Sequence, residues 1–159
     1  MNFLEELAAE WYEFQGYFVR TNIHFGKRAG GGYEGEIDVL AFDPGKKVLV
    51  HIETSGAANS WQERKACFKK KFSSAQNHYT SIFPPGFSSI RKIAIVGLTH
   101  PKKAIDFGDG IEIRTVIDFI NEISDELTKI RPLKEAVPEG FPLLRAIQFH
   151  LFAASKKLK

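Results

Sequence analysis

The spacing of apolar and polar positions predicts an α/β chain. Apolar residues at helical spacing predict helices over residues 3–15, 61–81, 117–129 and 141–155. Apolar and β-branched runs predict strands over residues 17–25, 36–42, 47–54 and 91–98, with a short strand over 111–114. This order of elements favours a three-layer α/β/α sandwich around a mixed central β-sheet.

The strands at 36–42 and 47–54 are predicted to form a hairpin. Asp-Pro-Gly-Lys at positions 43–46 predicts the turn, because Pro44 fixes φ and Gly45 accepts a positive φ. Successive side chains of a strand alternate between its two faces. Asp38 and Glu53 are therefore expected on adjacent antiparallel strands, near the end of the hairpin that lies away from the turn.

This acidic pair is the first candidate for chemistry. Two neighbouring carboxylates repel each other unless a positive charge lies between them, and their oxygens suit Mg²⁺ or Mn²⁺. The alternative is that Asp38 is a strand-end turn residue and Glu53 a surface residue. Both stand within apolar runs, where an unpaired carboxylate is costly, so the sequence favours a shared cation.

The hairpin also resembles a known family. Gly-Glu-Ile-Asp-Val-Leu-Ala at 35–41 and Leu-Val-His-Ile-Glu-Thr-Ser at 49–55 resemble the core of the PD-(D/E)XK nuclease superfamily, most of all its Holliday-junction-resolvase-like branch. The resemblance covers roughly residues 3–80. It implies a restriction-endonuclease-like fold, with Mg²⁺ or Mn²⁺ held by Asp38, Glu53 and the Thr54 backbone carbonyl.

Two features of the resembled site need further interpretation. The family often takes a metal ligand from its first helix, and Glu5 matches that place; the alternative is that Glu5 only complements the helix dipole. Ser55 stands where the family has the lysine of its Glu-x-Lys motif. We expect Lys65 to supply this cation from the following helix, with Lys69 in reserve, unless Lys65 merely covers core aromatics.

Basic residues gather on the helix predicted over 61–81. The predicted DNA contacts are Lys27, Arg28, Arg64, Lys69, Lys70 and Lys71, and further candidates for backbone contacts are Lys46, Lys47, Lys102 and Lys103. Such clusters are typical of phosphate binding. The alternative is a solvated helix face, but Glu63 is the only acidic residue at hand to pair with these lysines.

Composition sets the class of protein. A chain of 159 residues with 43% apolar residues and 14 phenylalanines predicts one globular domain over 1–159, with core motifs at 3–80 and C-terminal helices over 115–155. The net charge of +3 does not by itself demand nucleic acid. Cys67 is the only cysteine, which excludes an intrachain disulfide and favours a cytoplasmic setting. No apolar run is long enough to cross a membrane.

The predicted function is metal-dependent hydrolysis of phosphodiester bonds in DNA by an endonuclease. Its catalytic residues are expected to be Asp38, Glu53, Lys65 and Ser55, and its metal ligands Glu5, Asp38, Glu53 and Thr54. Because Ser55 departs from the family motif, the alternative is a nuclease-fold module that binds DNA or assembles without catalysis. A homodimer, or a partner subunit that recognises the target, is compatible with either interpretation.

Overall fold

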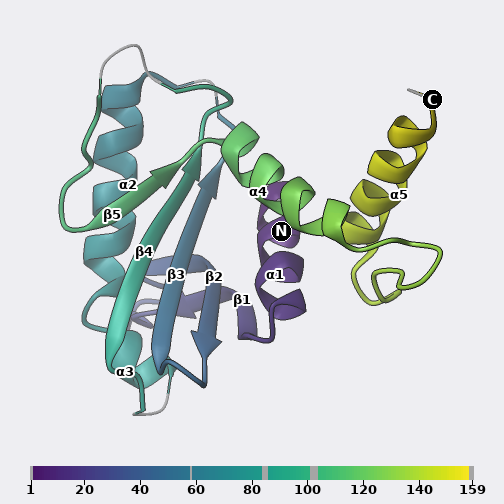
Figure 1. Ribbon diagram of the computed structural model, residues 1–159. Coiled ribbons are helices and arrows are strands. Elements are labelled where there is room, and N and C mark those ends of the chain that lie inside the picture. The colour runs from purple at the N-terminus through teal and green to yellow at the C-terminus, as the bar shows by residue number, and fades with distance from the viewer. Residues whose placement is uncertain (1, 58, 84–85, 101–103, 158–159) are drawn as a thin grey trace. The chain divides into compact units, whose positions relative to one another are not determined.

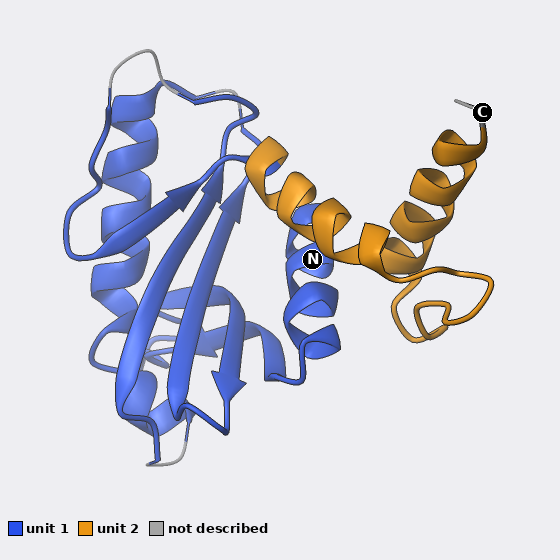
Figure 2. Ribbon diagram, viewed as in Figure 1, with its two compact units in different colours: residues 1–116 blue, residues 117–159 orange. Residues whose placement is uncertain are grey.

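The computed structural model describes residues 2–57, 59–83, 86–100 and 104–157. The chain divides into two compact units, Met1–Val116 and Ile117–Lys159 (Figure 2). All elements of the predicted hairpin and the helices around it belong to the first unit. The second unit holds the C-terminal helices. The prediction that the whole chain acts as one domain stays a prediction.

The first unit is built on a five-stranded mixed sheet. Its strands are β1 (Phe18–Phe25), β2 (Gly35–Asp43), β3 (Val48–Ser55), β4 (Ser89–Val96) and β5 (Ile111–Arg114), and they lie side by side in that order. β1, β2 and β3 pair antiparallel, whereas β4 runs parallel to both β3 and β5. The prediction of an α/β chain with a mixed sheet is therefore confirmed.

Helices cover the two faces of this sheet (Figure 1). α1 (Phe3–Phe14) buries an apolar stripe against one face, and its capping box joins Asn2 to Glu5. α2 (Trp61–Ala75) and α3 (Tyr79–Ile82) cover the other face, where Phe68, Phe72 and Tyr79 are almost fully buried. Each face thus has its own apolar contact with helices, as expected for an α/β sandwich.

One local prediction was wrong, and the hairpin turn differs from the expected one in a detail. The single helix expected over 61–81 is broken after Ala75, because the chain tightens into i→i−3 bonds, with the Gln76 amide donating to Ser73 O. At the hairpin turn, the positive φ falls on Lys47 (55°) instead of Gly45. The Asp43 side chain explains this, since its Oδ1 accepts bonds from the Gly45 and Lys46 amides and fixes the turn earlier in the chain.

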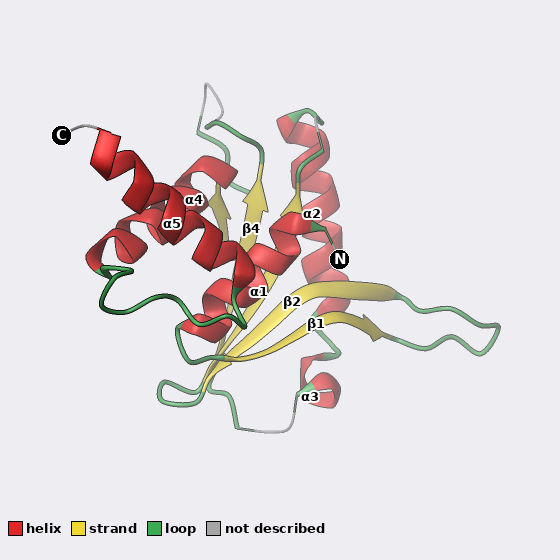
Figure 3. Ribbon diagram, turned by 90° about the vertical axis from the view of Figure 1, so that its right-hand side faces the viewer, coloured by secondary structure: helices red, strands yellow, loops and turns green. Residues whose placement is uncertain are grey.

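The sheet opens into a fork between β2 and β3. The β2–β3 ladder runs from Asp43 paired with Val48 to Val39 paired with Ile52, and goes no further. β2 continues beside β1 as far as Gly35, and β3 continues beside β4 as far as Ser55. Figure 3 shows β1 and β2 running away from β4 as a pair. Asp38 lies where the two strands begin to part.

The second unit contains α5 (Pro142–Lys157) and nearly all of α4 (Val116–Lys129), whose Phe119, Ile123 and Leu127 are buried. The buried side chain of Gln148 ties α5 to the preceding loop, because its amide bonds with the backbones of Ile130, Glu135 and Val137. In the part of the chain that the structure describes, no helix has the length and hydropathy needed to span a membrane.

Candidate active site

The structure brings the two predicted acidic residues together around one ammonium group. Lys71 Nζ lies 3.1 Å from Asp38 Oδ1 and 3.3 Å from Asp38 Oδ2, and it also donates to Glu53 Oε2. Glu53 is fully buried, and Asp38 is only 8% exposed. The hairpin therefore places both carboxylates on the sheet face covered by α2, close enough to share a cation.

The fork in the sheet creates the environment of Asp38. Its Oδ2 accepts a hydrogen bond of 2.8 Å from the Thr54 amide, which the shortened ladder leaves without a backbone partner on β2. The side chain of Asp38 thus replaces one rung of the ladder. Because the N–H and C=O of a strand residue point to the same neighbouring strand, the Thr54 carbonyl faces the fork as well.

Two buried residues hold the other carboxylate. His51 Nε2 lies 2.6 Å from Glu53 Oε1, and His51 Nδ1 lies 2.7 Å from the Tyr79 hydroxyl. An ionised Glu53 can only accept, so in that state His51 donates from Nε2 and accepts the Tyr79 O–H at Nδ1. This chain of bonds leaves Glu53 Oε2 as the oxygen that meets Lys71.

Burial and charge act in opposite directions on the pKa values of this site. Burial raises the pKa of Asp38 and of Glu53, and the repulsion between the two carboxylates adds to the rise at Asp38, while the Lys71 charge opposes both. Burial lowers the pKa of Lys71, but attraction to Glu53 and Asp38 outweighs it and the net shift is upward. Burial also lowers the pKa of His51 to about 3.

Lys71 contacts the acidic pair, whereas the predicted Lys65 does not. Lys65 is half-buried and has no ion pair with either carboxylate. The physical reason is how far each lysine lies along α2. The loop after Ser55 lets α2 begin beyond the end of β3, so a lysine further along the helix than Lys65 comes level with the acidic pair. Lys71 lies about 15 Å along the axis from Trp61, at 1.5 Å per residue. The role of Lys65 in catalysis stays a prediction, but its predicted position beside Glu53 belongs to Lys71.

The other predicted site residues lie outside this contact. The Glu5 carboxylate closes the capping box of α1, where it accepts hydrogen bonds from the Asn2 amide nitrogens. The Ser55 hydroxyl, at the end of β3, accepts a bond of 3.3 Å from the Ala57 amide. These hydrogen bonds do not join either residue to Asp38 or Glu53. Their roles as metal ligand and catalytic residue stay predictions.

The predicted DNA contacts fall in two places. Lys27 and Arg28 are exposed on the loop that joins β1 to β2, and Lys70 is exposed on α2. Lys69 pairs with Asp109 at 3.7 Å, and Arg64 stacks on Trp61 and donates to the Ala57 carbonyl at 3.0 Å. Lys71 is engaged by the acidic pair instead of facing solvent freely. Lys102 and Lys103 lie outside the described residues.

The site offers oxygen ligands for a divalent metal. One oxygen of each carboxylate faces the same point, and the Thr54 carbonyl faces the fork beside them, a set that suits Mg²⁺ or Mn²⁺. Within the described ranges, however, no cluster of three or more His, Cys, Asp or Glu side chains is arranged to hold a metal. The residues present therefore fit a metal held by two carboxylates, a carbonyl and waters.

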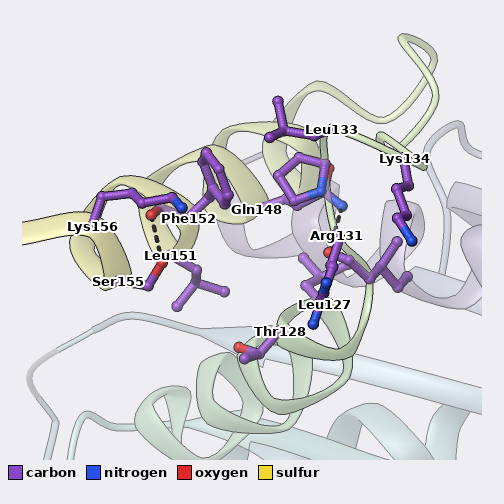
Figure 4. Close-up of a pocket in the computed structure, with 12 residues that line it drawn as sticks. Leu127, Thr128, Arg131, Leu133, Lys134, Gln148, Leu151, Phe152, Ser155 and Lys156 are labelled. Carbon is purple, nitrogen blue, oxygen red and sulfur yellow. Dashed lines mark hydrogen bonds between the residues drawn. The ribbon is translucent and has the colours of Figure 1, made fainter. Parts of the chain in front are cut away.

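A separate pocket lies wholly within the second unit. Its volume is about 430 Å³, and it lies between the end of α4, the following loop and α5 (Figure 4). Leu127, Leu151 and Phe152 line it together with three cations, Arg131, Lys134 and Lys156, and no carboxylate is among the residues around it. It contains none of the predicted site residues.

Sequence reasoning missed the supporting residues His51 and Tyr79. His51 stands two positions before Glu53, so strand alternation puts both side chains on one face, and that signal was available. Tyr79 follows the break in the helix and could not be placed without it. Comparison with models of known protein families and with curated proteins finds no match.

Proposed function

We propose that this protein is a metal-dependent nuclease that hydrolyses phosphodiester bonds in DNA, with a restriction-endonuclease-like core. The observation that carries the proposal is the convergence of Asp38 and Glu53 on one cation at a fork in the sheet. Two carboxylates on adjacent strands, with a lysine beside them, are the groups that the resemblance to PD-(D/E)XK nucleases implies.

Asp38, Glu53 and the Thr54 carbonyl would hold the Mg²⁺ or Mn²⁺ ion. When bound, such a metal supplies a polarised phosphate oxygen and a water of lowered pKa. His51 and Tyr79 keep the Glu53 carboxylate in one orientation, and the Thr54 amide does the same for Asp38. The protein therefore holds its ligand oxygens in place before a metal arrives, which is the basis of affinity in such sites.

Lys71 takes the role of the missing motif lysine in this proposal. Its ammonium group belongs to the same cluster as the two carboxylates, and its net pKa shift is upward, so it is charged at neutral pH. A positive charge near the scissile phosphate offsets the negative charge that develops in the transition state, and the Lys71 stem is long enough to bring its ammonium group there after it leaves the carboxylates. Because Ser55, at the position of the family lysine, carries no charge, the positive charge would come from α2.

The DNA itself would be held by exposed cations of the β1–β2 loop and of α2. Lys27 and Arg28 on the β1–β2 loop, together with Lys70 on α2, can reach phosphates without reading the base sequence. This arrangement predicts binding that weakens steeply with salt. Because these backbone contacts carry no sequence information, any sequence specificity would come from a recognition element or a partner subunit.

A second candidate function follows from one specific observation. Lys71 already offsets one of the two negative charges of the acidic pair, and no third acidic ligand joins the pair in the described part of the chain. A lysine that never leaves this position would make the protein a nuclease-fold module that binds DNA, or assembles with a partner, without catalysis. Metal binding separates the two candidates, because only the nuclease requires it.

The direct test is cleavage of supercoiled plasmid and of branched DNA in the presence of Mg²⁺ or Mn²⁺. The wild type should nick or cut at least one of these substrates, and Asp38→Asn should reduce cleavage to background. Asp43→Asn is the matched control, because it changes the same residue type on the same strand at the turn, where Asn can keep the turn's hydrogen bonds. Equal cleavage by wild type and Asp38→Asn would remove the acidic pair from the reaction.

A further inference from the structure

The acidic pair directs one oxygen of each carboxylate toward a single point, and Lys71 occupies that point. Glu53 Oε1 is bonded to His51, and Asp38 Oδ2 to the Thr54 amide. The oxygens left over are Asp38 Oδ1 and Glu53 Oε2. Both contact Lys71 Nζ, which also lies 3.3 Å from Asp38 Oδ2. These are the same two oxygens that a metal between the carboxylates would need.

We propose that Lys71 is a resident cation that closes the acidic site in the metal-free protein and that a divalent metal must displace. This inference rests on the proposed function, because it concerns the same metal position, and it adds to it a regulation by the chain's own side chain. Lys71 and the metal exclude each other: the protein is either closed by the ammonium group or loaded with metal.

The Lys71 ammonium group and a divalent metal cannot occupy the site at the same time. An ammonium group that donates to both carboxylates leaves no room for a metal at about 2 Å from the same oxygens. The positive charges would also repel strongly at such a separation in a partly buried site. Metal uptake therefore requires that Lys71 Nζ moves away from both carboxylates.

The position of Lys71 allows this movement. Its side chain is 34% exposed, whereas the side chain of Glu53 is fully buried. Lysine has a flexible four-carbon stem, so its ammonium group can turn outward to water without moving α2. The carboxylates cannot follow, because His51, Tyr79 and the Thr54 amide hold them. The cation is the mobile part of the site, and the ligands are the fixed part.

The closed state has a measurable cost for metal binding. If a metal binds only when Lys71 has left, its apparent affinity is its intrinsic affinity multiplied by the fraction of molecules in that open state. Removing the ammonium group should therefore tighten metal binding, even though Lys71 is placed in the active site. This outcome is the opposite of the one expected for a lysine that supports the metal.

The first experiment compares Mn²⁺ binding by calorimetry in three proteins: wild type, Lys71→Met and Lys70→Met. Lys70 is the matched control, because it precedes Lys71 on α2 and is exposed. We expect Lys71→Met to bind Mn²⁺ at least about 10-fold more tightly than wild type, and Lys70→Met to match wild type. Equal or weaker binding by Lys71→Met would overturn the inference.

The second experiment needs no substitution, so it holds even if Lys71→Met folds poorly. Wild type is treated with an acetylating reagent with and without saturating Mg²⁺, and the modified lysines are mapped by mass spectrometry. Displacement frees the Lys71 amine from its ion pair, so its labelling should rise several-fold on metal binding while that of Lys70 stays constant. Unchanged or reduced labelling of Lys71 in the metal-loaded protein would contradict the exchange.

The outcomes also separate this inference from the proposed function. If Lys71→Met binds Mn²⁺ and wild type neither binds it nor cuts DNA, the resident cation is supported and the nuclease function is lost. If wild type cuts DNA with Mn²⁺ while Lys71→Met binds the metal no more tightly, the function survives and the exchange is wrong. Failure of both proteins to bind Mn²⁺ overturns both.

Discussion

Two points on strand β2, the turn and the fork, each pair an aspartate with a lysine, but in opposite surroundings. At the turn, Lys46 Nζ lies 3.6 Å from Asp43 Oδ2, and backbone hydrogen bonds from the Lys46 amide and from Gly45 lower the pKa of Asp43. At the fork, Lys71 Nζ lies 3.1 Å from Asp38 Oδ1, yet burial raises the pKa of Asp38. The first aspartate shapes a turn, and the second is a charge that the fold holds at a cost.

This difference shows that the contribution of an ion pair to stability depends on its surroundings. A pair at the surface contributes little, because water and salt screen it. A buried pair is costly to form and costlier to break, since the remaining charge has no partner. The ion pair at the fork therefore affects both stability and function, whereas the pair at the turn affects only the hairpin.

The largest expected contrast comes from removing each lysine. Lys71→Met leaves two neighbouring carboxylates without their cation, and it should lower the free energy of unfolding by about 2–3 kcal/mol in metal-free buffer, less than a fully buried pair because Lys71 is partly exposed. Lys46→Met should leave stability unchanged. Urea denaturation of both variants measures this, and equal losses would show that the fork is no different from the turn.

Acid sensitivity gives the next contrast. Burial lowers the pKa of His51 from 6.5 to about 3, so between these values the unfolded state binds the proton and the folded state does not. Stability from this residue is therefore complete above about pH 6.5 and falls as the pH drops, by about 2 kcal/mol between pH 6.5 and pH 5.

His51→Gln should flatten this part of the stability curve, whereas His150→Gln on the exposed face of α5 should not. Thermal unfolding followed from pH 7 to pH 5 gives the comparison. A wild-type curve that falls no more steeply than that of His51→Gln would mean that His51 is not held neutral in the folded protein.

A smaller effect is expected for the residue behind His51. Tyr79→Phe removes the hydroxyl that donates to His51 Nδ1 and leaves the ring in place, which should cost about 1 kcal/mol of stability. Because His51 then loses its orientation toward Glu53, Mn²⁺ binding should weaken as well. Tyr33→Phe is the control, since Tyr33 is exposed. Unchanged metal binding in Tyr79→Phe would limit Tyr79 to a packing role.

The smallest effect is expected at the turn itself. Asp43→Asn keeps a side-chain oxygen for the Gly45 and Lys46 amides, so the hairpin should form as before and DNA cleavage should stay at the wild-type level. Circular dichroism and the plasmid assay check the two parts. A loss of cleavage with intact structure would contradict the assignment of Asp43 to the turn alone.

The hairpin and its acidic pair could be predicted because they depend on local rules. Alternation along a strand and a four-residue turn are enough to place Asp38 opposite Glu53. The fork could not be predicted, since it depends on where β2 leaves β3 to follow β1, a choice made by packing across the whole sheet. The bond from the Thr54 amide to Asp38 exists only because of that departure.

The contact of Lys71 with the acidic pair could not be predicted for a similar reason. Helical periodicity correctly placed Phe68 and Phe72 on the buried face, and both Lys65 and Lys71 flank that face. Periodicity gives the angle of a side chain around the helix but not the height at which the helix lies against the sheet. The height depends on the loop after Ser55, and it puts Lys71 beside the acidic pair.

The most direct test of the shared cation site is a Mn²⁺ titration of wild type and Glu53→Gln by calorimetry. We predict a single saturable site in wild type that is lost in Glu53→Gln, because the substitution removes one of the two charges that hold the ion. A wild type without saturable binding, or a Glu53→Gln protein that binds Mn²⁺ as wild type does, would contradict the account.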